Sequence, residues 1–224
     1  MTTFYEVVKD ATMRKSLLII NGATRPGGNT DILVERVVAG ASDVNLAPSV
    51  VELRNKQISN CIGCYQCLRI SMCSFRDEMT EIRALIEDAE LLVLASPLYW
   101  CGVTGLMKIF IDRLFFYYHP DTKPLIFGKK AVILMPMNQK NIEFESQLLV
   151  EFYKRFFNCL GVEIVDMVFF SDIMGKGSVS ERPEYLEQAY EIGTRLEKYT
   201  RDNEVRQPIA HNTGLAGHGI GGHK

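Results

Sequence analysis

The chain has 224 residues, of which 47% are hydrophobic and 23% are charged, so it can form a full core and is expected to fold as one domain. Its net charge of −2 lacks the basic excess of nucleic-acid-binding proteins. It contains no apolar run long enough to span a membrane and no signal peptide in its first sixteen residues, so we expect a cytoplasmic protein with reduced cysteines.

The first predicted strand, residues 15–22, is a short apolar run that ends in Asn-Gly, as expected for a strand buried on both faces of a parallel sheet. A loop rich in glycine and small polar residues follows it. Apolar residues at helical spacing then predict a helix with Asn29 or Thr30 as its N-cap. This order of elements is typical of an anion site, because free backbone N–H groups and the positive end of the helix dipole face one point.

The glycine-rich loop lacks the lysine of a Walker A motif and the pattern Gly-x-Gly-x-x-Gly, which argues against a triphosphate and a classical dinucleotide fold. A phosphate monoester fits better, held by N–H groups, the hydroxyl of Thr24 or Thr30, Asn29 and Arg25. An ordinary strand-to-helix turn is the alternative.

A cysteine-rich loop, placed at residues 55–76, follows the second predicted strand, residues 49–53. It contains four of the six cysteines, spaced C-x2-C-x2-C-x5-C: Cys61, Cys64, Cys67 and Cys73. Four thiolates are the ligands of a [4Fe–4S] cluster, and closely spaced cysteines are its local signature. Structural zinc also takes four thiolates, usually as two separate pairs. The run therefore predicts a metal loop and leaves both metals open.

The remaining pattern alternates strands with helices. Strands are expected at residues 90–96, 130–135 and 162–170, and helices at residues 77–89, 104–118, 144–160 (with Gly161 as C-cap) and 183–201. Five such strands predict an α/β fold, a doubly wound parallel sheet in three layers. Ligands of these sheets bind at the carboxyl ends of the strands, so we expect the loops after strands one, three and four and the cysteine loop to share one rim. We assign residues 1–203 to the domain and residues 204–224 to a flexible tail rich in glycine and histidine.

Five segments occur in an order that is more specific than any one of them. They are residues 22–30 (Gly-Ala-Thr-Arg-Pro-Gly-Gly-Asn-Thr), 61–73 with Asp-Glu-Met at 77–79, 96–100 (Ser-Pro-Leu-Tyr-Trp), 105–108 (Gly-Leu-Met-Lys) and 111–113 (Ile-Asp-Arg). In these segments the chain resembles the NAD(P)H-dependent FMN reductases of flavodoxin fold, and among them the iron–sulfur flavoproteins.

The resemblance implies FMN, with its phosphate on the first loop and its isoalloxazine ring against two later loops. The implied cofactor-binding residues are Thr24, Arg25, Gly28, Asn29, Thr30, Pro97, Leu98, Tyr99, Trp100, Cys101, Gly102, Pro136, Met137 and Asn138. One departure is Ala23, where the family often has serine, so Thr24 has to supply the hydroxyl.

The resemblance also implies a [4Fe–4S] cluster on Cys61, Cys64, Cys67 and Cys73, near the flavin of a neighbouring subunit in a homodimer or homotetramer. Electrons would pass from NAD(P)H, or from ferredoxin, through FMN to the cluster or to a quinone-like or other small acceptor. No side chain is expected to act as acid or base, because the flavin carries the chemistry. The alternatives are a reductase without a cluster, a flavodoxin-like electron carrier, and a protein with structural zinc.

Other reactive-looking residues have simpler interpretations. Cys101 is expected to be a small residue beside the ring, and Cys159 to belong to the core. Asp112 and Arg113 are expected to form structural ion pairs within the fold. The aromatic run at residues 115–118 is too large for one helix face, so part of it is expected at a subunit interface.

Overall fold

The computed structural model describes residues 15–200, so the predicted tail lies outside the described part. In chain order the elements are β1 (Lys15–Asn21), α1 (Asn29–Asp43), β2 (Leu46–Glu52), η1 (Leu53–Asn55), α2 (Cys67–Ile70), α3 (Met79–Asp88), β3 (Leu91–Ala95), α4 (Gly105–Arg113), η2 (Leu114–Tyr118), η3 (Lys123–Leu125), β4 (Lys130–Pro136), α5 (Ile142–Leu160), β5 (Glu163–Phe170), η4 (Ser178–Glu181), α6 (Pro183–Arg195) and α7 (Glu197–Thr200). No helix between residues 15 and 200 has both the length and the apolar character needed to cross a membrane.

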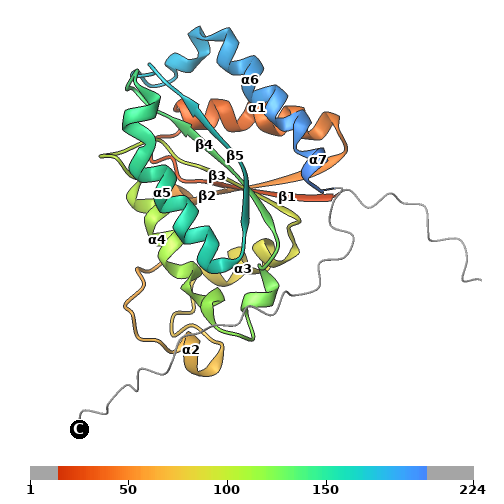
Figure 1. Ribbon diagram of the computed structural model, residues 1–224, viewed down its shortest axis with the longest axis vertical. Helices are drawn as coiled ribbons and strands as arrows, with labels where there is room; N and C mark the ends of the chain where they lie inside the picture. The colour runs from red at the N-terminus through yellow and green to blue at the C-terminus, as the bar shows by residue number, and fades with distance from the viewer. Residues whose placement is uncertain (1–14, 201–224) are drawn as a thin grey trace, which may run out of the picture.

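The five strands form one parallel sheet in the order β2-β1-β3-β4-β5 (Figure 1). The predicted doubly wound fold is therefore confirmed. From β1 the chain moves outward to β2 and then returns to the other side of β1 to form β3. The strand order reverses at this point, and such a switch is where open α/β sheets bind their ligands.

Helices cover both faces of the sheet, with α1 and α6 on one face and α3, α4 and α5 on the other (Figure 1). The core on the α1–α6 side includes Leu33, Val37 and Ile192. The core on the other side is larger and includes Phe110 of α4 and Tyr153 of α5. The central strands β3 and β4 are buried along their whole length, as expected for strands covered on both faces.

Most element boundaries agree with the predictions, and the differences have physical reasons. Strand β2 begins before Pro48, which is tolerated because β2 is an edge strand and needs no N–H on its outer side. The helix predicted at residues 104–118 changes after Arg113 into the 3₁₀ turn η2, where the aromatic run is concentrated. The last predicted helix is interrupted at Leu196 and divides into α6 and α7. Gly161 ends α5 in the left-handed conformation, with φ of 72°, as predicted for a C-cap.

Candidate functional site

A cavity of about 650 Å³ lies at the carboxyl ends of the strands, between the loops that follow β1, β3, β4 and β5. This volume is within the range of about 300–1,000 Å³ that is usual for small-ligand pockets. All the residues predicted to bind the cofactor line it except Gly102: Thr24, Arg25, Gly28, Asn29, Thr30, Pro97, Leu98, Tyr99, Trp100, Cys101, Pro136, Met137 and Asn138. The structure therefore brings three loops, far apart in the sequence, to one site.

Five further residues line the cavity: Ala23, Gln139, Glu145, Ile173 and Met174. Ile173 and Met174 belong to the loop after β5, which the sequence prediction omitted. The strand order could have indicated this loop, because the carboxyl ends of all strands in a parallel sheet lie on the same edge. Arg25 and Glu145 are the only charged residues among the lining residues that the structure describes.

The amino end of α1 opens on this cavity without a side-chain cap. The N-cap residue is Gly28, and no side chain bonds to the first turn, so the predicted cap at Asn29 or Thr30 was one or two residues too late. The first N–H groups of a helix have no partner within the helix. Uncapped N–H groups and the positive end of the dipole together suit a phosphate oxygen, so this end of the cavity fits the phosphate of FMN.

The side chain of Asn29, which lines the cavity, also makes two hydrogen bonds within the fold. Its amide nitrogen donates to the carbonyl of Gly175 at 2.8 Å, and its amide oxygen accepts from the backbone N–H of Val179 at 3.1 Å. Both amide atoms are thus used to hold the loop after β5 against the glycine-rich loop. The backbone N–H of Asn29 is one of the first N–H groups of α1, which have no partner within the helix.

A buried carboxylate organises the glycine-rich loop from beneath. Asp31 accepts from the Asn21 amide at 2.7 Å, the Gly27 N–H at 2.8 Å and the Arg54 guanidinium at 2.9 Å. These donors join the end of β1, the loop, and the turn after β2. Because Arg54 neutralises Asp31, the carboxylate in the first turn of α1 does not oppose binding of an anion there.

The opposite wall carries a tight turn of aromatic residues. Tyr99 and Gly102 exchange backbone hydrogen bonds of 2.9 and 3.0 Å around Trp100 and Cys101, whose φ angles are 49° and 58°. Positive φ at both central residues is the type I′ conformation, which residues other than glycine and asparagine rarely adopt. The turn makes the Trp100 side chain fully exposed, and the Tyr99 hydroxyl lies 3.4 Å from the hydroxyl of Thr24 across the cavity.

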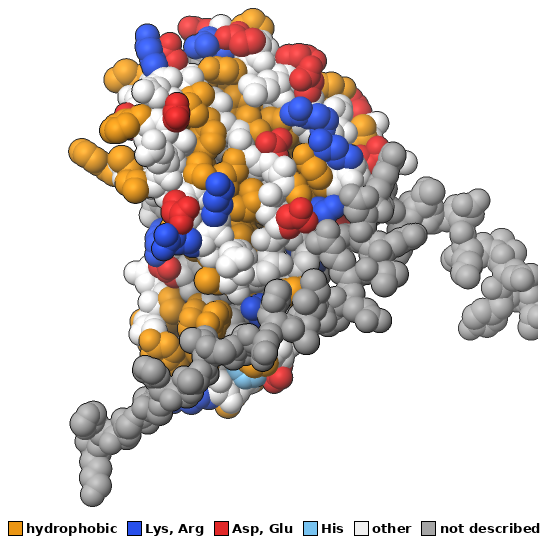
Figure 2. Space-filling model, viewed as in Figure 1, with side chains coloured by type: hydrophobic (Ala, Val, Ile, Leu, Met, Phe, Trp, Pro, Cys, Tyr) orange, Lys and Arg blue, Asp and Glu red, His pale blue; other side chains and the backbone are white. Residues whose placement is uncertain are grey.

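The cysteine loop does not share this rim, contrary to the prediction. None of its residues lines the cavity described above. Cys61, Gly63 and Tyr65 instead line a second cavity of about 480 Å³ against α4, η2 and α5. Figure 1 places α2, which begins at Cys67, at the lower end of the molecule, away from the amino end of α1. Hydrophobic side chains are visible on the lower part of the surface in Figure 2, and Ile70 and Met72 of this loop are exposed.

The four thiols lie on one loop and are not joined by disulfides. The Cys64 sulfur is 3.2 Å from the Ser74 hydroxyl, a hydrogen bond that lowers the pKa of Cys64. Burial raises the pKa of Cys67, and the charges of the other three cysteines add to this rise. Within residues 15–200, however, no three His, Cys, Asp or Glu side chains are already placed to hold a metal ion. The donor chemistry fits an iron–sulfur cluster, and its binding would require the loop to draw the sulfurs together.

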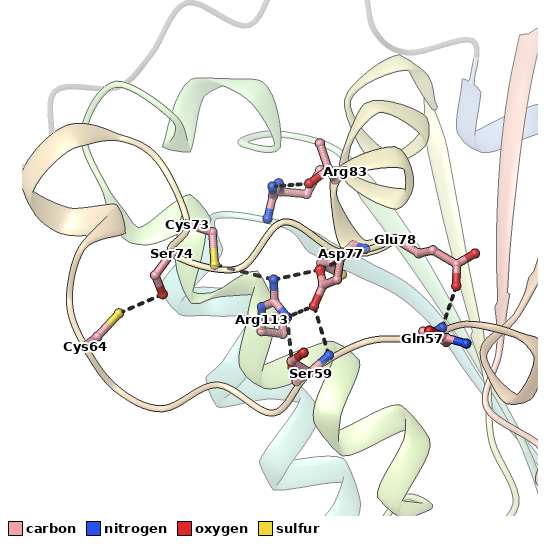
Figure 3. A network of polar contacts seen from close by, with 11 residues as sticks. Gln57, Ser59, Cys64, Cys73, Ser74, Asp77, Glu78, Arg83 and Arg113 are labelled. Carbon is pink, nitrogen blue, oxygen red and sulfur yellow. Dashed lines mark hydrogen bonds and ion pairs between the residues drawn. The ribbon is translucent and has the colours of Figure 1, made fainter.

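An ion pair between Asp77 and Arg113 lies behind the loop (Figure 3). Burial, the largest influence, acts to raise the pKa of Asp77. The guanidinium of Arg113 and the backbone N–H groups of Ser59 and Met79 outweigh it, so the pKa of Asp77 lies below its ordinary value. Asp112 forms a separate pair with Lys108 at 2.6 Å, so the prediction of ion pairs for Asp112 and Arg113 is confirmed.

Cys159 is exposed, so its prediction as a core residue was wrong. The buried stripe of α5 runs through Tyr153, Phe157 and Leu160, and Cys159 lies outside it because each residue turns the helix by about 100°. It lines the second cavity together with Cys61.

A comparison with protein-family models matches residues 16–155 to the family described as NADPH-dependent FMN reductase. An iron–sulfur flavoprotein from Archaeoglobus fulgidus is 33% identical over 114 residues, which are 51% of this chain and 52% of that protein. Another, from Methanocaldococcus jannaschii, is 32% identical over 94 residues, which are 42% of this chain and 49% of that protein. The chain thus spans about half the length of these curated relatives.

Among solved structures, a NAD(P)H:quinone oxidoreductase from Methanothermobacter marburgensis is similar with a TM-score of 0.66. The sequences are 21% identical, and the match covers 81% of this chain and 96% of that one. At this level of identity the similarity shows the fold.

Proposed function

The chain belongs to the NADPH-dependent FMN reductase family, and from this membership we propose that it is a flavin oxidoreductase that binds FMN in the 650 Å³ cavity and takes electrons from NAD(P)H. The observation that carries the proposal is the uncapped amino end of α1 facing two loops of mainly apolar and aromatic residues. The amino end of α1 suits the phosphate of FMN, and the two apolar loops suit its ring.

The residues of the chain divide the binding task. The N–H groups at the start of α1, with the hydroxyl of Thr24 and the guanidinium of Arg25, bind the phosphate. Residues 97–101 and 136–138 pack against the ring. These two loops are held together, since the Leu98 N–H donates to the carbonyl of Pro136 at 3.1 Å. When bound, FMN would accept a hydride and release electrons one at a time. The described lining residues include no histidine, and this chemistry needs no side chain as acid or base.

The four-cysteine loop is proposed to hold a [4Fe–4S] cluster through Cys61, Cys64, Cys67 and Cys73. The support is the spacing of the cysteines, the absence of disulfides between them, and the names of the relatives, which are iron–sulfur flavoproteins. A cluster bound there would take electrons one at a time. The absence of a closed set of ligands in residues 15–200 favours, as second candidate, a reductase that works without a cluster.

The wider role is also part of the proposal. NAD(P)H is the donor, with ferredoxin as the alternative, and a quinone-like or other small molecule is the acceptor. The quinone is supported by the name of the similar solved structure. We place the protein in the cytoplasm as a homodimer or homotetramer, in which exposed aromatic residues such as Tyr118 would be covered.

The first test is an absorption spectrum, with flavin and iron content, of protein purified without oxygen. We expect one FMN per chain, about four irons per chain with equal sulfide, and steady-state oxidation of NADPH or NADH. The variant Cys61→Ser should lose the iron, and Cys159→Ser, a cysteine outside the predicted ligand set, should keep it. Flavin without iron in the wild type would support the second candidate, and zinc without iron would exclude the cluster. No flavin even after FMN is added would refute the whole proposal.

A flavodoxin-like carrier is distinguished by kinetics. Such a protein would bind FMN but would not oxidise NAD(P)H at a sustained rate with a small acceptor. Turnover with a quinone would exclude it.

A further inference from the structure

Arg113, the last residue of α4, is charged yet its side chain is only 1% exposed. Its guanidinium makes hydrogen bonds to three different residues (Figure 3). Nη1 donates to the carbonyl of Ser59 at 2.8 Å and to Oδ2 of Asp77 at 2.6 Å. Nη2 donates to Oδ1 of Asp77 at 3.0 Å and to the sulfur of Cys73 at 3.4 Å. A single side chain thus contacts a carbonyl, a carboxylate and a thiol.

The three partners come from the two ends of the cysteine loop. Ser59 lies just before the first cysteine, Cys73 is the last cysteine, and Asp77 lies just after it. The same carboxylate also accepts the Ser59 backbone N–H at 2.9 Å. Arg113 and Asp77 together therefore close the loop at its base, and the Phe75 ring packs 5.2 Å from the guanidinium carbon.

Burying a guanidinium for loop closure alone is unfavourable, because desolvation of a charge offsets much of what its ion pair contributes. Among the described residues the Nε of Arg113 has no hydrogen-bond partner, which adds to this cost. This burial does, however, fix the orientation of the guanidinium relative to its partners. The planar fork holds the carboxylate with both nitrogens, and this leaves one N–H of Nη2 directed at the Cys73 sulfur.

The other end of α4 is attached to the FMN cavity. Thr104, its N-cap, donates from its hydroxyl to the carbonyl of Gly22 at 2.7 Å, and its N–H donates to the Ser96 hydroxyl at 3.2 Å. The helix lies so close to Gly22 that a Cβ there would be 2.9 Å from the Cβ of Met107. Both Gly22 and Ser96 directly precede loops that line the cavity. The nine residues of α4, about 13 Å long at 1.5 Å per residue, therefore connect the cavity to the cysteine loop.

We propose that Arg113 is a positioning residue, which closes the cysteine loop before any metal binds, donates to the Cys73 sulfur, and holds the loop at the end of α4 opposite the FMN cavity. The loop closure stands on the contacts above. The effect on a bound cluster rests on the proposed function. A positive charge and an N–H donor at a ligand sulfur both stabilise the reduced, more negative cluster, so Arg113 should raise its reduction potential.

The first arm of the test uses FMN-bound, metal-free protein and needs no cluster. Hydrogen exchange at the Ser59 amide and protease cleavage within residues 59–77 are compared between wild type, Arg113→Gln, Arg113→Lys and the control Lys108→Gln. Lys108 is a cation of the same helix whose ion pair lies on the surface. We expect exchange at Ser59 to be about tenfold faster or more in Arg113→Gln, intermediate in Arg113→Lys, and unchanged in the control. Unchanged exchange in Arg113→Gln would overturn the proposal.

The second arm follows anaerobic reconstitution with ferrous iron and sulfide, with redox titration of the bound cluster. The potential should be lower in Arg113→Gln than in wild type, with Arg113→Lys between them, because lysine keeps the charge but not the fork. Equal potentials in loaded wild type and loaded Arg113→Gln would also overturn the proposal, since loop closure alone would not move the potential. If the wild type takes up no iron, the cluster hypothesis fails and the first arm alone decides on Arg113. If Arg113→Gln fails to bind FMN, Arg113→Lys carries both arms, because it keeps the positive charge and loses the planar fork.

Discussion

Thr104 offers a quantitative test of how α4 is held to the cavity. The residue is 0% exposed, and its hydroxyl has two roles: it donates to the Gly22 carbonyl at 2.7 Å and accepts from the Met107 N–H at 3.2 Å as the N-cap of α4. Thr104→Val keeps the shape and removes both bonds. Loss of the cap is expected to cost about 1 kcal/mol. The buried carbonyl left without its donor adds about 1–3 kcal/mol.

The free energy of unfolding of Thr104→Val should therefore fall by about 2–4 kcal/mol, a large part of the 5–15 kcal/mol usual for a domain. Urea denaturation followed by circular dichroism measures it, on FMN-free protein so that ligand binding does not contribute. Thr104→Ser is the matched control. It keeps the hydroxyl and loses one methyl group, which costs about 1 kcal/mol.

A decrease for Thr104→Val below about 0.5 kcal/mol, or one no larger than that for Thr104→Ser, would refute the reasoning. Either result would mean that the hydroxyl is not what joins α4 to the end of β1. The affinity for FMN gives an independent measurement, because Gly22 precedes the glycine-rich loop, which is proposed to bind the phosphate of FMN. We expect it to fall in Thr104→Val and to be retained in Thr104→Ser.

Three further predictions follow from particular side chains. Tyr153→Phe should stabilise the protein by about 1 kcal/mol in urea denaturation, because the buried tyrosine hydroxyl has no partner among the described residues; a loss of stability would contradict this. The pKa of Asp77 is lowered in the folded protein, so its ion pair with Arg113 contributes fully above the unfolded pKa of about 3.9 and is lost as the pH falls through the lower folded value. Protease cleavage of the cysteine loop in wild type should therefore rise below about pH 4, and the same rise in Asp77→Asn would contradict the assignment. Free Cys159 should react with a thiol reagent in the folded protein as fast as an exposed cysteine, and protection until unfolding would show that it is covered, for example by a second copy of the chain.

The fold was predictable because periodicity alone specifies it. Short apolar runs that alternate with amphipathic segments allow few arrangements other than a parallel sheet with helices on both faces. Boundaries were less predictable where local chemistry and packing compete. The aromatic residues after Arg113 continue a helical pattern in the sequence, yet the structure tightens them into a 3₁₀ turn, with Tyr117 buried and Tyr118 exposed.

The residues of the cavity could be predicted where they directly follow a predicted strand. The loops after β1, β3 and β4 could be assigned to one edge from their place after apolar runs, and their residues do line one cavity. The role of Asn29 could not be read from the sequence, because its partners Gly175 and Val179 are about 150 residues away in the chain. The position of the cysteine loop could not be read either. A segment without periodicity carries no signal for its path, and only contacts such as that of Arg113 with Ser59 decide it.

Asp112 and Arg113 show why residue type alone does not predict which side chains of α4 contact the cysteine loop. Both are charged, adjacent in the same helix and engaged in ion pairs, so the sequence treats them alike. A rotation of about 100° per residue separates them, which leaves Asp112 about half exposed beside Lys108 and turns Arg113 into the protein against the cysteine loop. Because the same helix begins at Thr104 beside the 650 Å³ cavity, its length sets the separation of cavity and loop. A substitution that shifts α4 at either end is therefore expected to affect both sites.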